Sequence, residues 1–296
     1  MLRHGLLVLE VTLAVVLLSG AGLLMRSFVN VLRYDSGFDA RDILTATTLL
    51  SGSRYQSLSA RRLFAERLLP RLKAIPGLQA AALATAVPLR GADGDAFSVD
   101  NPNPPVGTRE VATSISISPD YFRAVGTPLF QGRPFSMDDT ATSAAVVIVN
   151  RSFARHYFNG HALGKRFYIG EAVQQGTGLG YGFVATTIVG VAADVRHNGI
   201  EHEVEPEFYL PLAQIPAYSL DLILRSDLDP ASLANAMRRA VTSVDRGQPL
   251  FDIQTMEERV SSLVTQRRLI MLLVACFALL AAILAAVGVY GVLRIL

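Results

Sequence analysis

The chain has 296 residues, of which 27 are Lys or Arg and 25 are Asp or Glu, giving a formal net charge of +2. This near-neutral balance argues against a dedicated nucleic-acid binder, which normally has a large basic excess. A hydrophobic fraction of 51% excludes a disordered chain, and the single cysteine, Cys276, excludes both an intramolecular disulfide and a zinc site built from several cysteines.

Apolar residues are concentrated at the two ends of the chain, which explains the high mean hydropathy of +0.36. Residues 6–25 contain one charge, Glu10, and residues 269–293 contain none. Each stretch is long enough for one transmembrane helix. Glu10 lies about one and a half turns inside the first stretch, where a position at headgroup level is favoured over the hydrocarbon core.

The first apolar stretch has a second interpretation, as a signal peptide, because residues 1–4 are weakly basic. It is longer than the usual apolar region of about 7–15 residues, which favours a retained helix. Both helices are expected to extend beyond the bilayer. Residues 255–287 contain neither Gly nor Pro, and a helix over 255–293 would be about 58 Å long, against a hydrocarbon core of about 30 Å.

The first half of the middle region alternates strand and helix patterns. Residues 43–50 and 78–87 are typical of strands, and residues 58–75 predict a helix with Ser59 as its N-cap and Pro70 as a kink. Residues 93–107 are rich in Gly, Asp, Asn and Pro and predict an exposed loop.

The second half continues in the same way. Strands are expected over 111–118, 145–149, 183–191 and 220–224. Two helices are expected, one capped by Asn150 and running to residue 158, and one that begins at Asp229 and Pro230. Strands and helices without a strict βαβ rhythm indicate an α+β domain.

Two glycine-rich segments resemble phosphate loops only superficially. Residues 160–166 are one residue short between the glycines, place Arg166 where a P-loop has Ser or Thr, and precede a strand. Residues 176–182 have a glycine at every second position and fit a hairpin tip better than a nucleotide site.

A third candidate is a group of acidic residues around His197 and His202. Their spacing matches no helical pair of metal ligands, so a solvated loop is favoured over a metal site. No nucleophile motif is present, because the chain has no GxSxG element and Cys276 lies in a predicted span. We therefore expect no catalytic, cofactor-binding or metal-binding residues and no enzymatic activity.

An ordered series of short motifs along nearly the whole chain resembles MacB/FtsX-type ABC transporter permeases, most closely the tandem-duplicated permease chains. Each motif is weak alone, but their order is specific. The matching segments are residues 8–14, 20–28, 35–39, 118–122, 132–135, 149–154, 163–166, 188–196, 209–211, 266–268 and 285–293.

The resemblance implies a permease component of an ABC-type exporter or mechanotransmission complex in the inner membrane, which couples a separate ATPase to movement of a periplasmic domain. It implies a first helix and stalk over 1–34, a MacB-like periplasmic core domain over 35–254, and a second stalk and helix over 255–296. The core domain would have two subdomains, the inserted one spanning about 87–205. Implied partners are an ABC ATPase subunit, the remaining permease helices or a second permease half, the lipid bilayer and a periplasmic adaptor protein.

Full permeases of this family have two more helices after the second. The resemblance therefore implies a fragment, a truncated reading frame or half of a split permease. An alternative function is a two-helix, membrane-anchored extracytoplasmic sensor or ligand-binding protein. A receptor would need a signalling module after residue 293, and three residues cannot provide one.

Overall fold

The computed structural model describes residues 12, 15, 16, 19, 20 and 22, and then 37–175, 178–199 and 203–293. For residues near 172–181 and for many after 262 it describes the backbone alone. The chain divides into two compact units. One is Ser36–Arg259, and the other combines Met1–Asp35 with Val260–Leu296.

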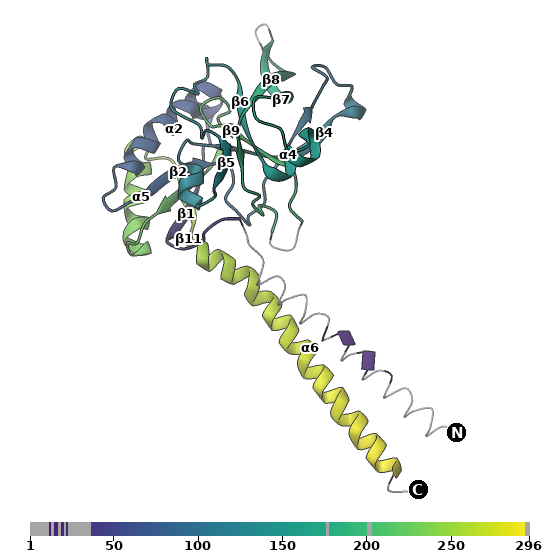
Figure 1. The fold of residues 1–296 in the computed structure, drawn as a ribbon. Helices are drawn as coiled ribbons and strands as arrows, with labels where there is room; N and C mark the ends of the chain where they lie inside the picture. Colours follow the sequence, from purple (N-terminus) through teal and green to yellow (C-terminus); the bar gives the residue numbers. More distant parts are fainter. Residues whose placement is uncertain are drawn as a thin grey trace. The chain divides into compact units, whose positions relative to one another are not determined.

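The unit Ser36–Arg259 contains an 11-stranded mixed sheet, so the mixture of helices and strands predicted from the sequence is confirmed (Figure 1). Its strands are β1 (Ile43–Leu49), β2 (Ala80–Ala84), β3 (Gly94–Ser98), β4 (Glu110–Ile117), β5 (Leu129–Gly132), β6 (Val146–Asn150), β7 (Arg166–Gln175), β8 (Gly178–Ala192), β9 (Glu207–Pro211), β10 (Ser219–Arg225) and β11 (Leu250–Thr255). Its helices are α2 (Leu58–Lys73), α3 (Tyr121–Val125), α4 (Arg151–Phe158), α5 (Pro230–Val244) and the first turn of α6 (Met256–Leu293).

The sheet has two differently built halves. Strands β11, β1, β10 and β2 form an open, antiparallel half. Beyond β2, the pairing runs β4, β3, β7, β8, β6, β9, and β9 then pairs in parallel with β4. The pairings of these six strands therefore return on themselves, and we call the two parts the open half and the ring.

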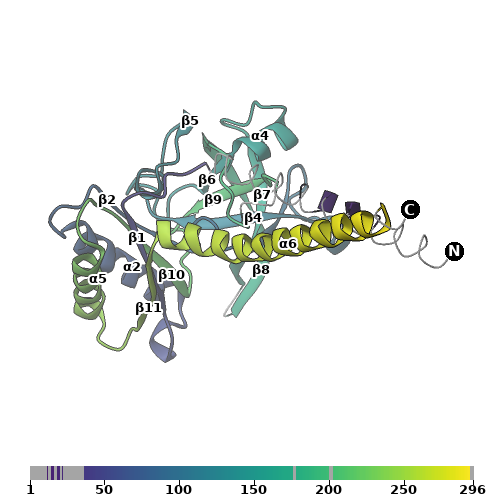
Figure 2. The same ribbon diagram turned by 90° about the horizontal axis from the view of Figure 1, so that it is seen from below.

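The open half buries aliphatic side chains under two helices. Helices α2 and α5 lie together beside β1, β10 and β11 in Figure 2, whereas α4 lies on the other part of the sheet. Phe64, Leu68 and Leu72 of α2 are buried, as their spacing predicted. They pack in one cluster with Leu222 of β10 and Met237 of α5.

The ring core combines four phenylalanines with nine aliphatic side chains. Phe97, Phe153, Phe167 and Phe208 come from β3, α4, β7 and β9 and are each 0% exposed. The rings of Phe97 and Phe153 lie 5.2 Å apart between centroids, and those of Phe153 and Phe167 lie 5.1 Å apart. This cluster is separate from the cluster of the open half.

Several local predictions are confirmed and two are wrong. Asn150 caps α4 by accepting a hydrogen bond from the Phe153 amide, and Asp229 caps α5. The N-cap of α2 is Ser57 and not Ser59, because the Ser57 hydroxyl accepts from the Ala60 amide. The predicted loop over 93–107 contains strand β3, which the buried Phe97 anchors to the ring core.

Helix α6 is a single helix of 38 residues, as the absence of Gly and Pro over 255–287 predicted. Among the helices of the described residues, none combines the length and hydropathy that a membrane crossing requires. The first predicted span, residues 6–25, falls almost entirely outside the described residues.

Candidate functional site

The junction between the sheet and helix α6 is stabilised by a reciprocal capping box. The Thr255 amide donates to the Glu258 carboxylate over 2.8 Å, and the Glu258 amide donates to the Thr255 hydroxyl over 3.1 Å. Two amides that a helix start leaves without intrahelical partners are thus satisfied. Met256 beside them is 0% exposed, so the first turn of α6 is part of the folded domain.

An arginine in the same turn ties α6 to two strands. The Arg259 guanidinium donates to the Asp252 carboxylate over 2.9 Å and to the Thr45 hydroxyl over 3.4 Å. Asp252 has a φ of 52°, a left-handed conformation that Asp tolerates better than most residues. The pairing of β1 and β11 shifts register at this position, and such a bulge redirects a side chain. Here it places the Asp252 carboxylate on Arg259.

A buried carboxylate lies on the neighbouring strand. Asp221 of β10 is 1% exposed and accepts hydrogen bonds from Arg90 and, over 2.6 Å, from the Thr47 hydroxyl. Burial raises the pKa of Asp221, and the bond from Thr47 and the charge of Arg90 oppose that effect. Its second oxygen, Oδ2, has no hydrogen-bond partner. The signal in the sequence is one acid within the apolar strand 220–224, which our prediction did not use.

The second polar cluster lies at the edge of the ring core and corrects one prediction. His197 was expected in a solvated loop, but it is 0% exposed. Its Nδ1 lies 3.0 Å from Oε2 of Glu207, and its Nε2 lies 3.1 Å from the hydroxyl of Tyr121. The hydroxyl of Tyr209 also donates to Glu207, over 3.2 Å.

This cluster is satisfied internally. Burial, followed by the nearby Glu207 carboxylate, raises the pKa of Tyr121 and of Tyr209 well above its usual value, so both hydroxyls remain protonated donors. Within the described residues, no group of three or more His, Cys, Asp or Glu side chains is arranged to hold a metal ion. His202, the other histidine considered, lies outside the described residues. Through His197, the cluster links Tyr121 of α3 to Glu207 of β9.

The two glycine-rich segments have the positions expected of them. Residues 160–166 lead into strand β7, so they do not open a helix as a phosphate loop does. Of the second segment, residues 178–182 are the start of strand β8, and Gly178 pairs with Gln175 of β7. Residues 176 and 177 themselves lie outside the described residues.

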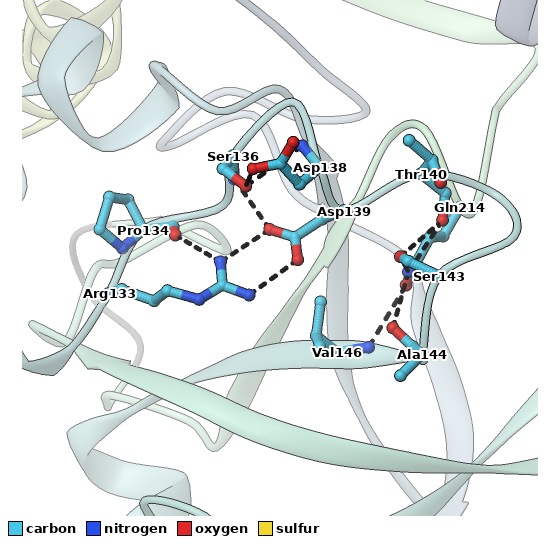
Figure 3. A network of polar contacts seen from close by, with 10 residues as sticks. All are labelled: Arg133, Pro134, Ser136, Asp138, Asp139, Thr140, Ser143, Ala144, Val146 and Gln214. Atoms are coloured by element: carbon cyan, nitrogen blue, oxygen red, sulfur yellow. Dashed lines mark hydrogen bonds and ion pairs between the residues drawn. The ribbon is translucent and has the colours of Figure 1, made fainter.

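A third polar network fixes a loop between β5 and β6 (Figure 3). Arg133 donates two hydrogen bonds of 2.8 Å to the two oxygens of Asp139, and the Ser136 amide donates to Asp139 over 2.8 Å. These bonds lower the pKa of Asp139. Further along, the Gln214 amide group donates to the carbonyls of Thr140 and Ala144. The loop is therefore held at both of its ends.

A family model described as the MacB-like periplasmic core domain matches residues 5–240. The chain belongs to this family. The match covers most of the chain and confirms the resemblance to MacB/FtsX-type permeases that the ordered motifs indicated.

One curated relative of this periplasmic core domain is the macrolide export ATP-binding/permease protein MacB of Chromobacterium violaceum. It is 23% identical over 192 residues, which are 62% of this chain and 28% of the relative. The chain therefore spans less than a third of the length of that relative.

Solved structures of similar fold include the periplasmic region of MacB from Actinobacillus actinomycetemcomitans, with a TM-score of 0.49, 16% identity and coverage of 79% of this chain and 97% of that one. A domain of a putative permease protein from Porphyromonas gingivalis has a TM-score of 0.43 and 18% identity, covering 74% of this chain and 92% of that one. The extracellular domain of the noncanonic ABC-type transporter YknZ from Gram-positive bacteria has a TM-score of 0.43 and 14% identity, covering 71% and 100%.

The sequence offered one unused signal for the junction at α6. Thr255 and Glu258 have the three-residue spacing of a capping box directly before the long helix. The partners of Arg259 carried no such signal, because Thr45 is 214 residues away along the chain.

Proposed function

We propose that this chain is a non-catalytic component of an ABC-type permease complex, in which a separate ATPase drives movement of a periplasmic domain. Residues 35–254 form that domain, on the periplasmic side of the inner membrane. Residues 6–25 and 269–293 anchor it as transmembrane helices. The family membership supports this proposal, as does the similarity to an export ATP-binding/permease protein.

The observation that carries the proposal is the continuity of α6 with the folded domain. A helix of 38 residues is about 57 Å long at 1.5 Å per residue. Its first turn is fixed by the capping box, by the Arg259–Asp252 ion pair and by the buried Met256. We infer that a displacement of this first turn moves β11 and β1 with it, because hydrogen bonds join them.

The later part of α6 has the surface of a lipid-facing helix. Its large apolar side chains are exposed, from Leu272 at 59% through Phe277 at 62% to Tyr290 at 66%. Exposed apolar surface of this kind is typical of membrane or protein contact sites. This supports a membrane position for residues 269–293.

The two halves of the sheet support a division into two subdomains. The inserted subdomain, about 87–205, supplies five of the six ring strands, and β9 at Glu207–Pro211 completes the ring just after it. The open half supplies the first turn of α6 and is the stalk-proximal subdomain. Further partners in this proposal are the remaining permease helices or a second permease half, together with a periplasmic adaptor protein.

Copurification tests the partner. The full chain, tagged and extracted from native membranes, is expected to bring down an ABC ATPase subunit identified by mass spectrometry. Ser262→Pro breaks α6 directly after its root, at a cost of roughly 3 kcal/mol in an interior turn, and should reduce ATPase stimulation by the domain without abolishing assembly. Ser262→Ala is the matched control. An unchanged ATPase rate in Ser262→Pro contradicts coupling through α6.

Cysteine labelling tests the topology, because Cys276 is the only cysteine of the chain. In a Cys276→Ala background, Val106→Cys places a thiol at a position that is 80% exposed in the domain. A membrane-impermeant maleimide should label it in cells whose outer membrane alone is permeabilised. Labelling only after the inner membrane is lysed contradicts the periplasmic position.

A further inference from the structure

A cavity of about 350 Å³ lies between helix α2 and the loop that Arg133 and Asp139 fix. We call it the α2 pocket. It is open to solvent on one side, so it is a surface pocket and not an interior void. Its size lies at the lower end of the range of small-molecule sites, about 300–1,000 Å³.

The walls of the α2 pocket are apolar and buried. Ala65 and Leu69 of α2 form one wall, and Phe135 of the loop lies opposite. The floor is made by the ends of β2, β4 and β9, with side chains that are at most 4% exposed, namely Leu83, Ile117 and Leu212. A ligand here would bury most of its surface against carbon atoms, which is the main favourable contribution to binding.

Two of the charges at the pocket mouth are paired within the protein. Lys73 forms a salt bridge of 2.5 Å with Asp120, and Asp139 is held by Arg133. The Arg62 Nε donates to the carbonyl of Ala213, and Glu66 lies one turn further along α2 with the opposite charge. A charged ligand of either sign would therefore meet a like charge beside the opposite one, so neither sign is favoured.

The loop wall of the pocket is held by hydrogen bonds within the protein. The Asp139 ion pair and the Gln214 hydrogen bonds hold its loop wall at both ends, as Figure 3 shows. A rigid wall spares a ligand the entropic cost of ordering a loop. The two walls also come from different parts of the sheet, since α2 covers the open half and the loop leads into β6 of the ring.

From this geometry we propose that the α2 pocket binds an uncharged, largely apolar small organic molecule. Such a ligand contacts both halves of the sheet at once and stabilises one arrangement of them. This goes beyond the proposed permease function and does not depend on it.

The absence of tryptophan from the chain makes a direct test possible. Met137 lies at the pocket mouth and is 70% exposed, so Met137→Trp adds a reporter without disturbing the core. The probe is N-phenyl-1-naphthylamine, which is uncharged and accepts energy from tryptophan. The full chain is held in phosphatidylcholine nanodiscs, and Val106→Trp, 80% exposed and outside the pocket, is the matched control.

Energy transfer from the Met137→Trp variant should rise with probe concentration and saturate. The Val106→Trp control should give only a weak signal that grows linearly as the probe enters lipid. Transfer that fails to saturate, or that is equal in both variants, overturns the proposal.

Two substitutions in the Met137→Trp background fill the pocket. Ala65→Phe places a large side chain in the pocket from α2, and Ser136→Leu does so from a half-buried position on the loop. Each should weaken saturable binding of the probe by more than roughly tenfold. Thr142→Leu, exposed on the same loop and outside the pocket, should leave it unchanged. Circular dichroism confirms that each variant is folded. Unchanged binding in a folded Ser136→Leu or Ala65→Phe variant overturns the proposal.

Discussion

The open half and the ring bury their apolar side chains in different ways. The open half leaves one face of β1, β10 and β2 to be covered, and α2 and α5 cover it with aliphatic side chains. The ring closes through the β4–β9 pairing and has to fill its own interior, which it does with four phenylalanines that contact one another and with nine aliphatic side chains. An open sheet can adjust by shifting its helices, but a closed set of strands cannot, so its interior depends on a few large side chains.

Their buried polar groups differ as well. In the cluster beside the ring, His197, Glu207, Tyr121 and Tyr209 bond to one another. In the open half, Asp221 retains one oxygen without a partner. A hydrogen-bond network in which every buried polar group has a partner rigidifies a structure. A buried polar group without a partner lowers the free energy of unfolding.

The largest effect is expected in the ring. Phe153→Ala removes a side chain that is 0% exposed and contacts Phe97, Phe167 and Phe208. It should lower the free energy of unfolding by about 3–5 kcal/mol, measured by urea denaturation followed by circular dichroism. Phe130→Ala makes the same change at a side chain that is 52% exposed and should cost far less. If the two variants lose the same free energy of unfolding, the ring core does not contribute more to stability than the exposed site.

The polar cluster comes next. Glu207→Leu leaves Nδ1 of His197 and the hydroxyl of Tyr209 buried without their acceptor. The free energy of unfolding should fall by about 2–3 kcal/mol, since an unsatisfied buried polar group costs about 1–3 kcal/mol. Glu203→Leu makes the same substitution at an exposed position and should be nearly neutral. A neutral Glu207→Leu variant would mean that apolar packing replaces the network without loss.

The pH dependence of the ring is a third test. Burial, aided by the charge of Asp95 on β3, raises the pKa of Glu171 to about 7 from 4.5. Because the folded state holds this proton more tightly than the unfolded state, the free energy of unfolding should fall as pH rises from about 4.5 to about 7. The fall should be about 2 kcal/mol after allowance for partial exposure.

Glu171→Gln should remove this pH dependence and leave the variant more stable than the parent above pH 7. Asp95→Asn removes the second cause of the raised pKa of Glu171. The pH range over which stability falls should then move part of the way toward lower pH. Thermal melts between pH 4 and pH 8 measure both. A parent protein whose stability rises over this range would contradict the assignment.

The smallest effect is expected at the root of α6. Thr255→Ala removes the hydroxyl that accepts from the Glu258 amide and should cost about 1 kcal/mol. Thr255→Ser keeps the hydroxyl and should restore most of the loss. If both variants match the parent in urea denaturation, the capping box does not stabilise the junction, and Arg259 and Met256 alone would hold α6.

The predictability of the elements follows the range of the interactions that form them. Helices α4 and α5 were predicted to within a residue or two because Asn150 and Asp229 cap them locally. Strands β3, β5, β9 and β11 were not predicted, since each pairs with a strand that is distant along the chain. The loop-like composition of residues 93–107 concealed β3 for this reason.

The same limit applies to the polar clusters. His197 sits among acidic residues that are typical of a solvated loop, and its neighbours along the chain give no indication of burial. Strand β9 brings Glu207 to one ring nitrogen, and α3 brings Tyr121, 76 residues away, to the other. Asp221 and Arg90 are likewise 131 residues apart.

The sequence by itself determined the mixed helical and stranded middle region, the N-caps of α4 and α5, the long helix that begins at Thr255 and, through an ordered series of motifs, the family. Local hydrogen bonds and hydrophobic periodicity determine these features within a few turns of chain. Only the tertiary structure decided that six strands close into a ring, that His197 is buried and that a pocket lies beside α2. These depend on pairing between segments tens to hundreds of residues apart, for which no local pattern exists.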